Sequence, residues 1–157
     1  MHQKTLHDAD MRVAVLAAEW LVTIDTPSGG VDSVLKGLEE DLCFVQGPYD
    51  CCSYTNGGGM QRFRCLEGSH AGNEESIQQT AASQIVVSIP QEIALLQRLF
   101  DSVFKHHVNE EPTIRVQEAF GSRSKLLDDK ENPNRYWNRA DMNTLHGHAV
   151  EVPHESS

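Results

Sequence analysis

The sequence predicts an α+β fold in which two helices cover one face of a four-stranded antiparallel sheet. Two observations lead to this prediction. Short β-branched or alternating apolar runs occur at several places along the chain, and two other segments carry apolar residues at helical spacing. At 157 residues, the chain is also long enough to bury the core that a layered fold requires.

The first strand and the first helix are expected between residues 12 and 42. The apolar run at residues 12–20 has no clear period and is compatible with a helix or a strand. Residues 21–24 are mostly β-branched and predict a strand, which the cluster of breakers at residues 25–30 should end. Residues 31–42 then carry apolar side chains at helical spacing with charged residues on the other side, and this pattern predicts an amphipathic helix.

A β-hairpin is predicted around the glycine triplet at residues 57–59. Residues 51–55 before it and residues 60–66 after it both have a strand-like composition. Glycine accepts the positive φ that a tight reversal needs, so the triplet would form the tip. Gly68 would end the second strand, and the polar residues 71–83 would form a loop.

The last three elements are a strand, a helix and a strand. Residues 84–89 predict a strand that stops at Pro90, because proline suits the first turn of a helix. Apolar residues line one face of the following helix, at residues 93–106. Residues 113–117 alternate between apolar and polar and predict the last strand, which continues to about Phe120.

The resulting order, β-α-β-β-α-β, is that of the ferredoxin-like arrangement. It assigns residues 20–120 to one domain and leaves residues 1–19 as an N-terminal extension. From residue 121 onward the composition becomes polar and charged, so residues 121–157 are expected to be a tail that is disordered or draped on a neighbouring surface.

Charge and hydropathy narrow the classes of partner. The formal net charge of −10 repels phosphate backbones, which disfavours nucleic acid as a partner. No stretch approaches the roughly 20 apolar residues of a membrane span, so no membrane association is expected. The N-terminus also lacks the basic and apolar regions of a secretory signal. We therefore expect a cytoplasmic protein whose four cysteines are reduced thiols.

Two motifs resemble those of a known family. The first comprises Gly47-x-Tyr49-Asp50-x-Cys52-Ser53, Gly59, Phe63 and Leu66-Glu67-Gly68-Ser69; the second is His107-Val108-Asn109-Glu110-Glu111-Pro112. Both resemble the YqfO-type domain, which occurs as an insertion in Nif-three-like proteins and as free-standing short chains. The second motif is similar to the family's His-Pro-Tyr-Glu-Glu-Pro signature. The resemblance implies a ferredoxin-like module related in shape to PII and CutA proteins, and such modules commonly form trimers.

The sequence departs from the family pattern in both motifs. Val108 and Asn109 replace the proline and tyrosine of the signature, and Cys51 stands where the family often has histidine. The two-metal site of the larger Nif-three-like proteins belongs to a core domain outside the resemblance. The resemblance therefore does not imply metal hydrolase activity.

The two motifs contain side chains that could bind a small ligand or a metal. If the hairpin and the last strand share a sheet, seven of them would converge near one sheet end: Tyr49, Asp50, Cys52, Glu67, His107, Glu110 and Glu111. Thiolate, imidazole and carboxylate together can bind zinc or another divalent metal, with His107, Cys52 and Glu67 as the expected metal ligands. The alternative is structural, with Asp50 and Glu67 bonded to turn N–H groups.

The cysteines show no zinc-ribbon or CxxC spacing, so the sequence favours buried, inert thiols. Adjacent residues on a strand point to opposite faces, so only one of Cys51 and Cys52 can face a given site. A nucleophile pair of Cys52 and His107 is the enzymatic alternative. The sequence offers no oxyanion-hole element to support it.

Three functions remain open from the sequence. The first is a non-enzymatic ligand- or metal-sensing module that acts as a homo-oligomer, expected to be a trimer, with its site between subunits. The second is a small metal-dependent or thiol enzyme that uses Cys52 and His107. The third is a structural adaptor whose tail contacts a partner. The sequence favours a protein without catalysis.

Overall fold

A computed structural model of the chain describes residues 6, 11–43, 45–70, 74–125, 129–133, 135–141 and 151–153. The chain divides into two compact units, Met1–Ser124 and Lys125–Ser157. The first unit contains β1 (Ala14–Pro27), the 3-10 helix η2 (Ser28–Gly30), α1 (Val31–Asp41), β2 (Val45–Gln46), β3 (Tyr49–Asp50), β4 (Tyr54–Phe63), β5 (Gln78–Pro90), α2 (Ile93–His106) and β6 (Thr113–Ser124). None of the described helices is long and apolar enough to span a membrane.

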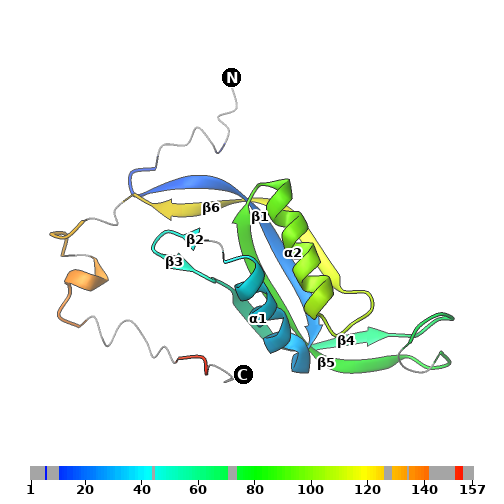
Figure 1. The fold of residues 1–157 in the computed structure, drawn as a ribbon. Coiled ribbons are helices and arrows are strands. Elements are labelled where there is room, and N and C mark those ends of the chain that lie inside the picture. Colours follow the sequence, from blue (N-terminus) through cyan, green and yellow to red (C-terminus); the bar gives the residue numbers. More distant parts are fainter. Residues whose placement is uncertain are drawn as a thin grey trace. The chain divides into compact units, whose positions relative to one another are not determined.

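The first unit has the architecture that the sequence predicts. Its main sheet has the order β4-β5-β1-β6, and every neighbouring pair is antiparallel. Helices α1 and α2 lie together over one face of this sheet (Figure 1). The α+β class and the ferredoxin-like arrangement are thereby confirmed.

The core lies between the two helices and the two central strands. Val22 and Ile24 of β1, and Ile85 and Ile89 of β5, are fully buried because the period of a strand places alternate residues on the helix-covered face. The helices add Val34, Leu38, Leu99 and Val103 from their apolar stripes. We call these eight residues, together with Val87, the helix-covered core.

A close crossing between the helices fixes the end of α1. A Cβ atom added to Gly37 would lie 2.2 Å from Cδ2 of His106, so only a glycine allows the α2 ring to approach this closely. The ring Nε2 lies 3.5 Å from Oδ2 of Asp41, and the Arg98 guanidinium donates to the backbone oxygen of Asp41. The C-terminal end of α1 is therefore held against α2.

The predicted hairpin around the glycine triplet is wrong. Strand β4 continues through the triplet without a reversal, and its partner is β5. The register shifts between Asn56 and Gly59, where Gly58 has a φ of +79°. Glycine suits a β-bulge as well as a turn, because both require backbone conformations that a side chain disfavours. Residues 78–83, expected to be a loop, form the first half of β5.

Strands β1 and β6 are longer than the strands that the sequence predicts. Their pairing extends from Asp25 opposite Thr113 to Ala14 opposite Ser124. The ambiguous apolar run at residues 12–20 therefore belongs mostly to a strand. The bounds of the N-terminal extension and of the domain remain predictions.

The second unit contains a short 3-10 helix, η3 (Tyr136–Asn138). Its Trp137 Nε1 donates to the backbone oxygen of Asp129 at 3.3 Å, and Arg135 pairs with the Asp129 carboxylate. The predicted tail at residues 121–157 falls partly on residues outside the described part of the chain, and its state stays a prediction.

Candidate functional site

The segment between α1 and β4 brings two cysteines together. Helix α1 ends at Asp41, with the Leu42 N–H bonded to the Leu38 oxygen, so Cys43 comes just after the last helical turn. Strands β2 and β3 pair antiparallel, and Gly47, with a φ of +60°, lies in the turn between them. This small hairpin reverses the chain and returns Cys51 to Cys43.

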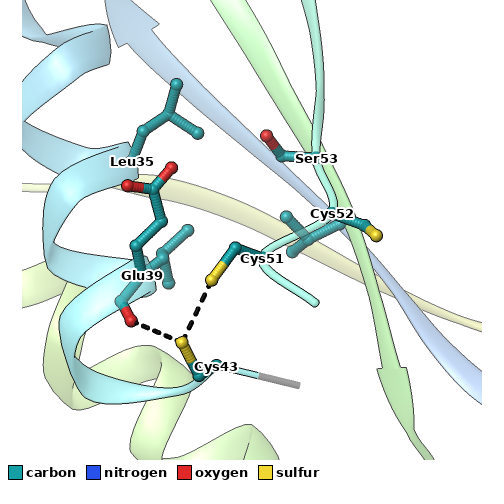
Figure 2. A pocket seen from close by; sticks show the side chains of 8 residues that line it. Leu35, Glu39, Cys43, Cys51, Cys52 and Ser53 are labelled. Carbon is teal, nitrogen blue, oxygen red and sulfur yellow. Dashed lines mark hydrogen bonds between the residues drawn. The ribbon is translucent and has the colours of Figure 1, made fainter. Parts of the chain in front are cut away.

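The two thiols and a carboxylate form a compact group. The Sγ atoms of Cys43 and Cys51 are 3.0 Å apart, and Cys43 Sγ donates to the Glu39 backbone oxygen at 2.9 Å (Figure 2). A carboxylate oxygen of Asp50 and both Sγ atoms lie within 4.8 Å of one another. We call these three residues the thiol–carboxylate cluster. Cys43 and Asp50 are exposed and Cys51 is half-buried, so solvent ions can reach the cluster.

The surroundings of Cys51 favour its neutral thiol. The hydrogen bond with Cys43, then burial, and then the negative charges of Asp50, Cys43 and Glu39 together raise the pKa of Cys51 to about 12. A site that resists a further negative charge is one where a cation would be stabilised. Bound cations invert this effect on thiol pKa values, because they stabilise the thiolate directly.

Cys51 also has an unusual backbone conformation. Its φ is +53°, and it is the one non-glycine residue with a positive φ in the described part of the chain. The left-handed region costs an L-residue roughly 1–2 kcal/mol. Such conformations persist where the surrounding structure imposes them, and they cluster at functional sites.

A small hollow lies beside the cluster. It is lined by Leu35, Leu38, Glu39, Cys43, Cys51, Cys52, Ser53 and Val87. Its volume of about 10 Å³ is the room that a single water molecule needs. The hollow therefore suits an ion or a water molecule rather than an organic ligand.

Tyr49, Asp50 and Cys52 all lie on this segment, but their side chains point to different places. Tyr49 is exposed on β3. The Cys52 sulfur points away from the Cys43–Cys51 pair (Figure 2) and lies 3.6 Å from the Asp50 backbone oxygen. One of the adjacent cysteines thus faces the cluster, and it is Cys51; both lie between β3 and β4 rather than on a strand, so strand alternation is not the cause. A role for Cys52 as a metal ligand stays a prediction.

His107 lies elsewhere, before β6. Its Nε2 is 2.8 Å from the Asp25 backbone oxygen, and its Nδ1 accepts a hydrogen bond from the Asn109 N–H. Both ring nitrogens therefore have backbone partners. Among the described contacts, none joins His107 to Cys52. Within the described part of the chain, His107 is therefore not positioned as a base for Cys52.

Glu110 forms a separate contact with the loop before β5. The His70 N–H and the Ser69 hydroxyl donate to its carboxylate, and the His70 ring pairs with it. The His70 backbone bond, followed by the His70 ring and Ser69, lowers the pKa of Glu110. Glu67 and Glu111 are exposed. The described contacts therefore do not bring the seven residues together at one site.

The expectation of buried thiols is wrong for three of the four cysteines, and the expectation that they are inert stays a prediction. Cys43 is exposed, Cys51 and Cys52 are half-buried, and Cys65 is buried as expected. Sequence reasoning missed Cys43 and Cys51 as a pair because their spacing matches no metal-binding motif. The available signal was the glycine turn at Gly47, which lies between the two cysteines.

Comparisons with known proteins support the fold. Neither a protein-family model nor a curated protein sequence matches the chain. The structure is similar to a NIF3-related protein from Bacillus cereus, with a TM-score of 0.55 and 18% identity over 78% of this chain. The match spans only 30% of that protein's length. The fold-level resemblance expected from the two motifs is thereby confirmed.

Two smaller proteins give weaker structural matches. CutA1 from Oryza sativa matches with a TM-score of 0.48 and 16% identity, over 68% of this chain and 84% of that one. A nitrogen regulatory PII-like protein from Thiomonas intermedia, bound to ADP, AMP and bicarbonate, matches with a TM-score of 0.45 and 14% identity, over 69% and 97% of the two chains.

Proposed function

We propose that this protein is a non-enzymatic metal-sensing module that binds one zinc-like cation at the thiol–carboxylate cluster. One observation carries the proposal: ligand atoms of Cys43, Asp50 and Cys51 lie within 4.8 Å of one another. Two soft sulfur ligands and one carboxylate oxygen form a set that zinc accepts.

The spacing of the sulfurs fits zinc after a small adjustment. With Zn–S bonds of about 2.3 Å and tetrahedral angles, the two sulfurs of a zinc site lie about 3.8 Å apart. The observed separation is 3.0 Å. The adjustment is under ~1 Å, which the exposed Cys43 side chain can supply by rotation. The residues present therefore fit the ion.

The number of ligands favours sensing over a structural role. Structural zinc sites have four protein ligands, whereas the described residues offer three at this cluster and leave one position to water or another ligand. A three-ligand site holds its cation less tightly, so the cation can exchange with its surroundings.

Binding would tie two elements of the fold together. Cys43 follows α1, and Cys51 precedes β4. A cation held by both would fix the β2–β3 hairpin against the helix end. Val45 and Tyr49 of this hairpin have 68% and 60% of their surface exposed. Metal binding would thereby determine whether this exposed apolar surface is held in one conformation. A partner could recognise that change, as a sensor requires.

The proposal includes a homo-oligomer, with a trimer as the expected state. Strands β4 and β6 are the edges of the main sheet. Exposed edge strands present unpaired N–H and C=O groups, and proteins commonly cover them. Pairing between copies of this chain would cover these edges. Native mass spectrometry measures the number of chains in the assembly.

Zinc titration under reducing conditions tests the metal site. We expect one zinc per chain by elemental analysis, with an affinity that falls by about 100-fold or more in Cys43→Ser and Cys51→Ser, since thiolates supply most of the binding free energy. The matched control is Cys52→Ser, because its sulfur points away from the cluster. A wild-type protein without zinc, or an equal loss in Cys52→Ser, would overturn the proposal.

A further inference from the structure

We propose that Cys43 and Cys51 are also an oxidation site, at which a peroxide converts the two thiols to an intramolecular disulfide. The disulfide would eject the cation, and this part of the inference rests on the proposed function. Peroxide would then act as a second input to the same site.

The geometry places the sulfur pair between two bonded states. A disulfide bond is about 2.05 Å long, and two sulfurs on one zinc are about 3.8 Å apart. The observed separation of 3.0 Å lies between these values. A movement of about 1 Å in one direction forms the disulfide, and a similar movement in the other direction admits the cation.

The local fold directs Cys51, rather than its neighbour, to this reaction. The cysteines are eight positions apart, and the β2–β3 turn at Gly47 holds the two ends of the segment together. The Cys51 sulfur faces Cys43, whereas the Cys52 sulfur points away from the pair (Figure 2). Cys65 is buried. The structure therefore selects one pair out of four thiols.

Exposure sets the order of the two chemical steps. Cys43 is exposed and Cys51 is half-buried, so a peroxide in solvent reaches the Cys43 sulfur first. The Cys43 thiolate would attack one oxygen of hydrogen peroxide. The O–O bond breaks, hydroxide leaves and is protonated to water, and Cys43 becomes a sulfenic acid.

The second step closes the bond. The Cys51 sulfur attacks the Cys43 sulfur, the S–O bond breaks, and the departing hydroxide takes the Cys51 proton to form a second water. Overall, two thiols and one peroxide give one disulfide and two waters. The thiol pair loses two electrons, and the peroxide gains them.

The two modifications of the pair exclude each other. A disulfide removes two of the three ligands of the cluster, so the cation leaves. A bound cation in turn occupies both sulfurs and slows their reaction with peroxide. Because binding and oxidation act on the same atoms, each should oppose the other.

The test uses the reduced, full-length chain with hydrogen peroxide, first without and then with zinc. Without zinc, we expect the free thiols to fall from four to two, with the loss of two hydrogens from the intact mass. Peptide mapping should find a link between Cys43 and Cys51. Cys52→Ser and Cys65→Ser should keep this link, and Cys43→Ser and Cys51→Ser should lose it. Saturating zinc should slow the reaction by about 10-fold or more.

The outcomes separate this inference from the proposed function. A link in a protein that binds no zinc would overturn the metal site and leave the oxidation site standing. Zinc binding in a protein whose peroxide products are sulfinic acids, links to Cys52 or links between chains would overturn the oxidation site alone. A link that forms equally fast with and without bound zinc would overturn the coupling between the two.

Discussion

The helix-covered core and the segment from Cys43 to Ser53 are held together in different ways. Core residues such as Ile24 and Leu99 have no exposed surface and contact one another through apolar side chains alone. The segment contains two-residue strands with exposed side chains, and its described side-chain contacts are the Cys43–Cys51, Cys43–Glu39 and Cys52–Asp50 hydrogen bonds. The two regions adjoin at Leu38 and Val87, which line the hollow beside the cluster. Substitution of a core residue that does not line the hollow, such as Leu99, should therefore affect stability without affecting the proposed chemistry.

The largest expected effect is in the core. Leu99→Ala should lower the free energy of unfolding by about 3 kcal/mol, because it removes a fully buried side chain and leaves a cavity. Ile93→Ala on the same helix is the matched control, since Ile93 is 69% exposed; it should cost less than about 0.5 kcal/mol. Urea unfolding measures both. Equal losses would remove the distinction between the core and the surface of α2. The zinc stoichiometry of folded Leu99→Ala should match that of the wild type.

A smaller loss is expected at the helix crossing. Gly37→Ala places a Cβ atom 2.2 Å from the His106 ring, so the ring must move and give up its contact with Asp41. We expect a net loss of about 1–2 kcal/mol from overpacking, even though alanine is the better helix former. Gly29→Ala is the control, because its Cβ would meet nothing within 4 Å. A Gly37→Ala protein as stable as the wild type would show that the two helices can separate freely.

The cysteine segment should affect stability mainly at alkaline pH. The pKa of Cys51 is about 12 in the folded protein, above its ordinary value of 9.0. The folded state then holds this proton more tightly than the unfolded state. The associated stability is fully present below pH 9 and is lost as the pH rises toward 12.

Unfolding of the reduced, metal-free protein at about pH 7.5 and about pH 10.5 tests this sign. The wild type should lose more stability over this interval than Cys51→Ser, and Cys52→Ser should behave as the wild type. The difference should be smaller than the effect of Leu99→Ala, because Cys51 is partly exposed. An identical pH dependence in the wild type and Cys51→Ser would show that ionisation of the Cys51 thiol does not affect the stability of the protein.

The smallest effect is expected at Glu110, on the surface. Its lowered pKa means that its contacts with His70 and Ser69 add stability above its ordinary pKa of 4.5, and that this contribution is lost as the pH falls. Glu110→Gln should therefore be slightly less stable than the wild type near neutral pH, and the difference should vanish in acid. Thermal unfolding across this range, with the exposed Glu111→Gln as control, measures it. A difference that persists in acid would assign the effect to something other than charge.

Periodicity in the sequence predicts most of the core. The apolar spacing at residues 31–42 and 93–106 predicts both helices, and the buried positions of α1 and α2 lie in those stripes. Residues 84–89 are a strand as predicted. The glycine triplet led to a wrong hairpin prediction because glycine is common in both turns and bulges. Only the pairing of β4 with β5 distinguishes the two.

The sequence by itself determined the fold class, because burial of an apolar face follows from the local spacing of residues along a helix or strand. The tertiary structure alone decided which thiols meet. The contact of Cys43 with Cys51 depends on where α1 ends, on the turn at Gly47 and on the positive φ of Cys51. Residue patterns indicate the helix end and the turn, but not the contact between the two sulfurs, because the distance between two side chains is set by the path of the backbone between them.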